Sequence, residues 1–232
     1  MKHLIIISII IYPFYLFISN AIEQHATRVA GITRMNPYGM IEEGRSLLKE
    51  GDLVVRLNRD PSSRFIKCFN HKDKNYSHSG IVLFEQGYPY VYHIIDGEEN
   101  PDQKMRKDSL NHFCNPRKNI AFGIYRYNMS AGEIGKLKDI VHEWYAKGLQ
   151  FDSAFSLASD DRMYCSEMIS KALMAATGKR ILIEPVELTM VEASFLTIHT
   201  HLPLAYTNHL RILPIDALYV NPFCRLIKKY DY

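Results

Sequence analysis

The chain has 232 residues, of which 47% are hydrophobic and 23% are charged, a composition typical of a globular protein with a full core. Its net charge of +3 is small and scattered, which argues against a nucleic-acid partner. The sequence contains no internal repeat, low-complexity segment or glycine-rich phosphate loop, and this excludes repeat architectures and P-loop nucleotide hydrolases.

The first 21 residues have the features of a secretory signal. Lys2 and His3 form a short polar region, Leu4 to Ile18 is almost wholly apolar, and Ser19-Asn20-Ala21 supplies the small residues that a signal peptidase recognises. The apolar run is shorter than the ~20 residues that span a bilayer. We therefore expect a secreted or periplasmic protein whose single domain covers residues 22–232. The alternative is an uncleaved signal, which would be the only membrane contact that we expect.

Residues 33–75 precede the first candidate site residue. Thr33 to Glu50 is expected to form a short helix that ends at Gly51, and Asp52 to Leu57 is expected to form a strand. Asn58 to Asn75 is polar and mixed in charge. It is predicted to be a loop that borders a cleft, or a short helix around residues 65–69.

A hairpin is predicted next, and it carries two histidines. His78 opens a β-rich run, Gly87 with Pro89 interrupts it, and Tyr90 to Ile95 forms a second run that contains His93. If Gln86 and Gly87 form a two-residue loop, both histidines lie on the same face of the hairpin. A three-residue loop would send them to opposite faces.

The middle of the chain alternates irregular and regular segments. Asp96 to Arg117 is expected to be an irregular insert, and Ile120 to Tyr127 alternates as a strand does. Ser130 to Glu133 forms a capping box, from which a helix with Trp144 in the core should run to Gly148. The charged residues of the insert are Asp102, Lys104, Arg106, Lys107 and Asp108. We expect most of them only to face solvent.

Asp160 to Gly178 is predicted to be a helix with Cys165 in its first turn. Its apolar residues recur at helical spacing, and Asp160 and Asp161 can cap its start. Amide N–H groups at a helix start stabilise a thiolate, so Cys165 is a candidate nucleophile. The alternative is a small buried residue.

Beyond this helix, four prolines break Ile181 to Tyr232 into short pieces. Leu202 to Tyr206 and His209 to Leu213 are predicted to be strands or lips over the core. The segment also carries three histidines that we expect at the surface, namely His199, His201 and His209.

The other cysteines allow two further interpretations. Cys68, Cys114 and Cys224 leave one odd thiol beside a free Cys165, so at most one disulfide is compatible with a free nucleophile. Zinc binding by Cys68, His71, His78 and His93 is the second interpretation, but these spacings fit no compact ligand-pair motif. We therefore expect no metal and no cofactor.

The order of five motifs resembles the YiiX/YaeF-like permuted NlpC/P60 proteins, which are papain-like cysteine amidases. The resemblance covers about residues 44–178 and implies an α+β fold in which an antiparallel sheet packs against helices, one of them bearing the nucleophile. It also implies Cys165 as nucleophile, His78 as general base and His93 as the third polar residue, with Asp152 in a supporting role. The motifs are Gly51 to Arg56, Ser77 to Leu83, Tyr90 to Asp96, Phe151 to Phe155 and Arg162 to Leu173.

These residues predict acyl-enzyme chemistry. A helix N-terminus and an adjacent imidazolium would lower the thiol pKa, and the Cys165 N–H, with Tyr164 as a candidate second donor, would stabilise the oxyanion. The expected activity is hydrolysis of an amide bond in a peptide or the cell wall. Lipid acyl transfer or ester hydrolysis by the same residues is the alternative, and a non-catalytic binding module is a second one. The sequence gives no oligomeric state.

Overall fold

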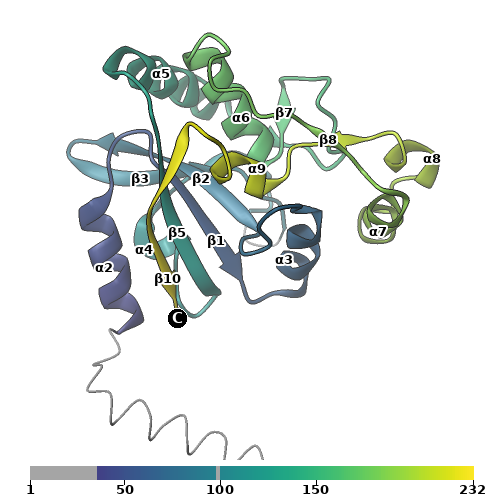
Figure 1. Cartoon of the computed structure of the whole chain (residues 1–232), viewed down its shortest axis with the longest axis horizontal. Helices are drawn as coiled ribbons and strands as arrows, with labels where there is room; N and C mark the ends of the chain where they lie inside the picture. Colours follow the sequence, from purple (N-terminus) through teal and green to yellow (C-terminus); the bar gives the residue numbers. More distant parts are fainter. Residues whose placement is uncertain (1–35, 98–99) are drawn as a thin grey trace, which may run out of the picture. The chain divides into compact units, whose positions relative to one another are not determined.

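Six antiparallel strands form the sheet on which the rest of the protein is built (Figure 1). The computed structural model describes residues 36–97 and 100–232, so the proposed signal and the start of the helix expected from Thr33 lie outside the described residues. The strands, in spatial order, are β10 (Cys224–Asp231), β5 (Asn119–Tyr127), β1 (Leu53–Asn58), β2 (His78–Glu85), β3 (Tyr88–His93) and β4 (Arg106–Ser109).

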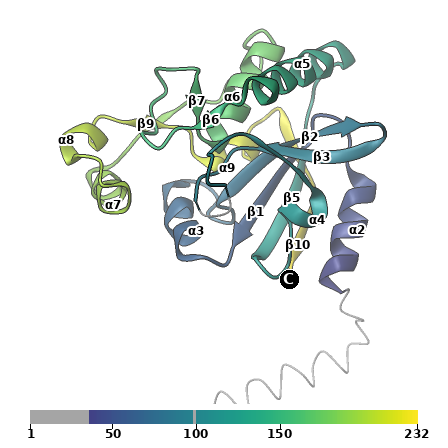
Figure 2. The same cartoon turned by 180° about the vertical axis from the view of Figure 1, so that it is seen from behind.

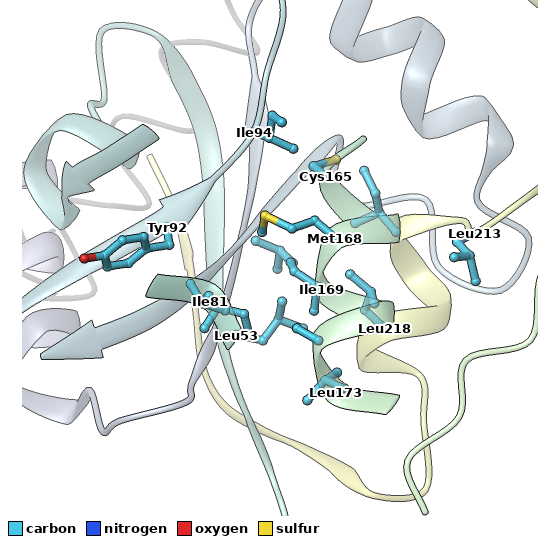
Figure 3. Packing of buried hydrophobic residues seen from close by; sticks show 14 of the residues in the cluster. Leu53, Ile81, Tyr92, Ile94, Cys165, Met168, Ile169, Leu173, Leu213 and Leu218 are labelled. Carbon is cyan, nitrogen blue, oxygen red and sulfur yellow. The ribbon is translucent and has the colours of Figure 1, made fainter. Parts of the chain in front are cut away.

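Helices cover both faces of the sheet. One face packs against α5 (Ala131–Lys147), α6 (Cys165–Ala176) and α9 (Ile215–Tyr219), and Figure 3 shows Met168 and Ile169 of α6 beside Leu53 and Ile81 of the sheet. The other face packs against α2 (Pro37–Leu47) and α4 (Leu110–Phe113). Alternate strand residues enter the two cores, as the pleat requires. The result is the expected α+β architecture.

The β2–β3 hairpin has the predicted two-residue turn. Ile81 pairs with Tyr92 and Glu85 with Tyr88, which leaves Gln86 and Gly87 as the turn residues. Both have positive φ, 50° and 84°, as the tight hairpin turn that matches strand twist requires. The register therefore confirms that His78 and His93 share a face.

The capped helix and the loop after β1 form as short-range chemistry dictates. Ser130 and Glu133 make the predicted capping box of α5, which ends at Gly148 in the left-handed conformation. The segment after β1 folds as the short helices α3 (Pro61–Ile66) and η1 (Lys67–Phe69), one of the two predicted outcomes. The Asp60 side chain accepts a hydrogen bond from the Ser63 amide and so begins α3.

Three local predictions are wrong. Residues 96–117 are not wholly irregular, because their second half adds β4 to the sheet edge beside β3 and continues into α4. Asp160 and Asp161 do not cap α6: the chain stays extended through β7 (Arg162–Met163), which pairs with β6 (Gln150–Phe151), and Tyr164 is the N-cap residue. Of the two forms predicted for Leu202 to Tyr206, a strand or a lip over the core, the strand does not form, because α8 (Leu204–Thr207) begins within the segment.

The C-terminal third forms a projection and then returns to the sheet. α7 (Met190–Thr200) and α8 lie away from the sheet in both views of the molecule (Figures 1 and 2), and β8 (Val186–Glu187) pairs with β9 (Arg211–Ile212) at their base. β10 then adds an edge strand beside β5. Within the residues that the structure describes, no helix is both long enough and apolar enough to span a bilayer.

Candidate active site

Cys165 is the first residue of α6. Five residues of the predicted apolar stripe are buried and anchor the helix against the sheet, so the position of its N-terminus is fixed; they are Met168, Ile169, Ala172, Leu173 and Ala176. The Cys165 side chain is 9% exposed. It therefore lies beside the unpaired amide groups of the first turn while remaining almost dry.

The environment of the Cys165 thiol does not favour the thiolate that the sequence predicts. Burial raises the pKa of the Cys165 thiol above its ordinary value, and hydrogen bonds from Ser79 and Ser166 act in the opposite direction without overcoming it. Apart from this contact with Cys165, the fully buried Ser79 hydroxyl has no hydrogen-bond partner among the described residues. The Cys165 side chain is therefore a neutral thiol at neutral pH.

The two histidines of the hairpin form a direct hydrogen bond. His78 Nε2 and His93 Nδ1 are 2.9 Å apart, and both rings are buried. Gly80 allows this approach: a Cβ there would lie 2.5 Å from Val91 Cγ1 and 3.0 Å from the Tyr92 carbonyl oxygen. The glycine of the Ser77-His78-Ser79-Gly80 motif thus sets how closely β3 approaches β2 beside the histidines.

Asp108 continues the chain of hydrogen bonds on the far side of His93. Its Oδ2 lies 3.0 Å from His93 Nε2. Burial alone would raise the pKa of Asp108, but the hydrogen bond from His93, helped by the nearby positive charge of Arg106, holds the pKa below its usual value. The carboxylate is therefore ionised and accepts the proton of His93 Nε2–H.

Both imidazoles are neutral at neutral pH. Burial lowers the pKa of His93 to about 4, against the raising effect of Asp108. Burial, then the positive charge of Arg56, holds the pKa of His78 well below its usual value. Arg56 stands opposite His78 in the sheet, where its Nη1 donates to the Phe113 carbonyl at 2.6 Å and its guanidinium lies 4.5 Å from the Phe113 ring centre.

These protonation states determine which nitrogen of His78 can act as a base. Because His93 donates from Nε2 and is neutral, its Nδ1 is an acceptor. His78 must then donate from Nε2, which leaves the lone pair of His78 on Nδ1. The chain from Asp108 through His93 therefore selects His78 Nδ1 as the proton acceptor.

His78 and Cys165 line one cavity of about 560 Å³. Because neighbouring residues of a strand face opposite sides, Ser79 and not His78 faces α6. His78 is the first residue of β2 and lines the cavity from there. Among the described residues, no hydrogen bond joins the Cys165 sulfur to either histidine. Catalytic hydrogen bonds commonly form only in the substrate complex, so this separation is compatible with a nucleophile and base that meet across a bound substrate.

The cavity is walled mainly by apolar side chains from several elements. Polar groups, among them Arg59, Asp96 and Lys118, occupy part of its boundary. Apolar residues that contribute to the wall include Ile66, Phe69, Phe155, Leu196, Ile212 and Ile215.

Comparison with known proteins identifies the family. The model of the permuted papain-like amidase family YaeF/YiiX, C92, matches residues 47–205, well over half the chain. The chain belongs to this permuted papain-like amidase family. It is 26% identical over 133 residues to the uncharacterized protein YiiX of Escherichia coli (strain K12), an alignment that covers 56% of this chain and 60% of that protein.

A solved structure supports the same fold. The crystal structure described as that of metalloprotein yiiX from Escherichia coli O157:H7, DUF1105, superposes with a TM-score of 0.63 at 21% identity. The superposition covers 79% of this chain and 98% of that one. The predicted fold and family are thereby confirmed, and at the level of the family the activity is that of a cysteine-type amidase.

Tyr164 and Asp152, the two predicted support residues, make hydrogen bonds to backbone groups near Cys165. The buried Tyr164 hydroxyl accepts a hydrogen bond from the Leu213 amide at 2.8 Å and lies at the cavity wall. The Asp152 carboxylate accepts from the amides of Ala154 at 2.9 Å and Ser156 at 2.6 Å. Tyr164 retains an O–H to donate, so its oxyanion role stays a prediction.

Glu167 fixes the start of α6 from within. Its Oε2 accepts from the Tyr164 amide at 3.2 Å, and its Oε1 lies 2.9 Å from Lys171 Nζ. Burial raises the pKa of Glu167 to about 7, with Lys171 opposing the rise. Glu167, which follows the Cys-Ser pair, therefore holds the backbone at the start of α6 in place.

The other cysteines and histidines that the sequence offers as candidates do not join the chain of hydrogen bonds from Asp108 to His78, although His112 lies 3.7 Å from Asp108. Cys68, Cys114 and Cys224 are free thiols in the part of the chain described. His71 lies 3.2 Å from Glu192, and His199, His201 and His209 are exposed as predicted. No group of three or more His, Cys, Asp or Glu side chains among the described residues could hold a metal ion.

Sequence reasoning missed three residues that surround the predicted site. The sequence predicts a solvated face for Asp108, gives Ser79 no role within its motif, and places Arg56 only in the first strand and at the end of the first motif. A signal existed for Ser79, since a residue that follows the base in a strand must face the opposite side. Asp108 had none, because the charged side chains of its strand show no apolar alternation.

Proposed function

We propose that the protein is a cysteine-dependent amidase that acts through an acyl-enzyme on Cys165, with His78 as general base and His93 as its orienting partner. The observation that carries the proposal is the shared cavity: the buried thiol at a helix start and a histidine of fixed tautomer face the same space. His78 Nδ1 takes the thiol proton as the sulfur attacks the substrate carbonyl carbon. Proton transfer and attack occur together, because neither the thiolate nor the imidazolium is favoured beforehand.

The second half of the reaction returns every group to its starting state. The C–N bond breaks as His78 returns the proton to the leaving nitrogen, and a thioester remains on Cys165. His78 then takes a proton from a water molecule as the water oxygen attacks the thioester carbon. The C–S bond breaks, the acid leaves, and His78 returns the proton to the Cys165 sulfur. During both steps Asp108 stabilises the positive charge through His93, while burial and Arg56 oppose that charge and make the His78 imidazolium a better proton donor than a free one.

The oxyanion is stabilised by the backbone N–H of Cys165 at the start of α6, with Tyr164 as a second donor. One such donor contributes roughly 3 kcal/mol to the transition state. The Ser79 hydroxyl stabilises developing charge on the sulfur rather than on the oxygen, since its hydrogen bond lowers the pKa of Cys165.

The substrate favoured by the cavity is an amide whose acyl side is apolar. A pocket that presents isoleucine, leucine and phenylalanine to its occupant gains free energy by removing hydrocarbon from water. A strongly polar cell-wall peptide would leave these side chains without apolar contacts. The same wall equally supports the alternative substrate class, lipid esters, which differ only in the leaving atom. If the signal interpretation is right, the protein acts outside the cytoplasm.

A metal is not used in this scheme. The related E. coli structure is titled a metalloprotein, but here His78 and His93 bond directly to each other, and Cys68 bonds to the Arg64 carbonyl at 3.2 Å. The four residues considered for zinc therefore do not converge, and no step is routed through a metal.

The test measures release of amine from N-acyl amino acids that carry acetyl or dodecanoyl groups, by the wild-type protein and by Cys165→Ala. We expect turnover that favours the dodecanoyl substrate and is abolished in the variant, with a thioester adduct on Cys165 by mass spectrometry. Hydrolysis of phospholipids or acyl esters without amine release would replace the amidase with the lipid alternative. Binding of substrate with no adduct and no turnover would favour the binding module.

A further inference from the structure

The projecting helix α7 presents an apolar stripe to solvent. Val191, Phe195 and Ile198 follow one another at helical spacing and are 64%, 48% and 67% exposed. Met190 beside them, and Leu204 and Tyr206 of α8, are also exposed. Half of the large exposed hydrophobic side chains of the described residues thus belong to this one projection.

The stripe is not a misplaced part of the core. The opposite side of α7, with Ala193 and Leu196, is buried against Phe69 and Ile212 and already anchors the helix. Contiguous exposed apolar surface of this kind marks a site that something else covers.

The charges around the stripe indicate what that partner is. Residues 193–210 contain no Asp, Glu, Lys or Arg. The flanking segment 61–72 lies alongside, because the Phe65 ring stacks on His199 with centroids 3.9 Å apart and His71 pairs with Glu192. That segment carries three cations, and none of Arg64, Lys67 and Lys72 has an ion pair with a carboxylate of the described residues.

We propose that the α7–α8 projection docks on an anionic lipid bilayer surface, inserting the Val191, Phe195 and Ile198 side chains while Arg64, Lys67 and Lys72 contact the headgroups. An apolar helical stripe bordered by unpaired cations is complementary to such a surface in both hydrophobicity and charge. Apart from Glu192, which pairs with His71, α7 carries no Asp, Glu, Lys or Arg. Apolar side chains that project from such a helix suit a fluid hydrocarbon layer better than the fixed contour of a protein partner.

Docking on a bilayer extends the proposed function. What docking implies for the substrate depends on that function. The inner side of α7 supplies Leu196 to the wall of the Cys165 cavity, so the docked helix separates the lipid from that cavity by its own thickness. An amide with an apolar acyl group, the substrate class proposed above, partitions into such a bilayer. This contact is additional to the one expected from an uncleaved signal.

The experiment is sedimentation of the full chain with vesicles of phosphatidylcholine, with and without phosphatidylglycerol. We expect binding that requires phosphatidylglycerol and weakens with salt, and a drop of at least about tenfold in Val191→Ser/Phe195→Ser/Ile198→Ser. The matched control, Tyr88→Ser/Leu182→Ser/Leu226→Ser, alters three exposed apolar residues elsewhere and should bind as the wild type does. Arg64→Gln/Lys67→Gln/Lys72→Gln should lose the dependence on phosphatidylglycerol.

Three outcomes overturn the proposal. Equal binding by all variants places the membrane contact elsewhere, for example in Leu4 to Ile18. A dimer in solution that the α7 triple variant dissociates, with no vesicle binding, makes the stripe a self-association surface. Absence of binding by the wild type also refutes docking. None of these outcomes depends on turnover. Hydrolysis of a water-soluble amide without vesicle binding would refute only the docking proposal. Vesicle binding without turnover would refute only the proposed amidase activity.

Discussion

His93 Nε2 lies 3.0 Å from the Oδ2 atom of Asp108, a residue that no catalytic motif of the sequence includes. This contact fixes the tautomers of two histidines in succession and so determines which nitrogen of His78 carries a lone pair. The carboxylate does not touch the cavity. It is a positioning residue that acts through His93.

Asp108→Asn is expected to reduce kcat by at least about tenfold with little change in KM, because an amide N–H that donates to His93 Nε2 reverses both tautomers and leaves His78 Nδ1 protonated. The loss should shrink as pH rises, since hydroxide then deprotonates the thiol without the base. Steady-state kinetics across pH measure both effects.

Two further variants separate positioning from simple damage at this site. Asp108→Glu keeps the charge and should recover part of the rate, and Asp102→Asn, an exposed carboxylate of the same segment, should leave the kinetics unchanged. If Asp108→Asn instead lowers activity equally at every pH and Asp108→Glu does no better, the carboxylate is only structural.

Cys165 is expected to alkylate slowly at neutral pH and faster as pH rises above the ordinary thiol range, because its buried thiol has a raised pKa. Peptide mass spectrometry after iodoacetamide treatment measures this, with the exposed Cys68 in the same sample as a reference thiol. Ser79→Ala should raise the apparent pKa further by removing one hydrogen bond to the sulfur. Rapid alkylation of Cys165 at pH 6 would show instead the thiolate and imidazolium pair that the sequence predicts.

Much of the fold and part of the site follow from short-range patterns in the sequence. The helical stripe after Cys165, the capping box at Ser130 and the turn at Gln86-Gly87 each depend on neighbours within a few residues, and all three predictions are confirmed. The shared face of His78 and His93 then follows from the two-residue period of strands.

The predictions that failed concern features set by contacts between distant segments of the chain. Asp108 faces His93 only because β4 pairs with the sheet edge, and the charged side chains of Arg106 to Ser109 give no apolar alternation to indicate a strand. Likewise, the start of α6 is set by the pairing of β7 with β6, which keeps the chain extended past Asp160 and Asp161. The prediction of a lowered Cys165 pKa failed for a related reason, since the burial of the thiol depends on the packing of the whole core.

His93 should make the protein less stable as pH falls. Its folded pKa of about 4 is below the unfolded value, so its neutral form stabilises the fold fully above about pH 6.5, and this contribution is lost as pH falls toward 4. Between pH 7 and pH 5 the loss from this one residue is about 2 kcal/mol. Urea unfolding at both pH values should show a smaller loss in His93→Gln than in the wild type; equal losses would mean that His93 does not titrate as described.

Gly80→Ala is expected to destabilise the protein by about 1–3 kcal/mol and to lower activity as well, because its Cβ would lie 2.5 Å from Val91 Cγ1 and 3.0 Å from the Tyr92 carbonyl oxygen. The Val91 methyl can move, but the backbone oxygen can yield only if β3 shifts away from β2, and His93, whose Cβ is 3.2 Å away, shifts with it. The matched control is Gly135→Ala on α5, where an added Cβ meets nothing within 4 Å and should stabilise the helix by up to about 1 kcal/mol. Thermal unfolding and kcat measured on the same samples test both variants. If Gly80→Ala is as stable and as active as the wild type, the close approach of the two strands is not what holds His93 against His78.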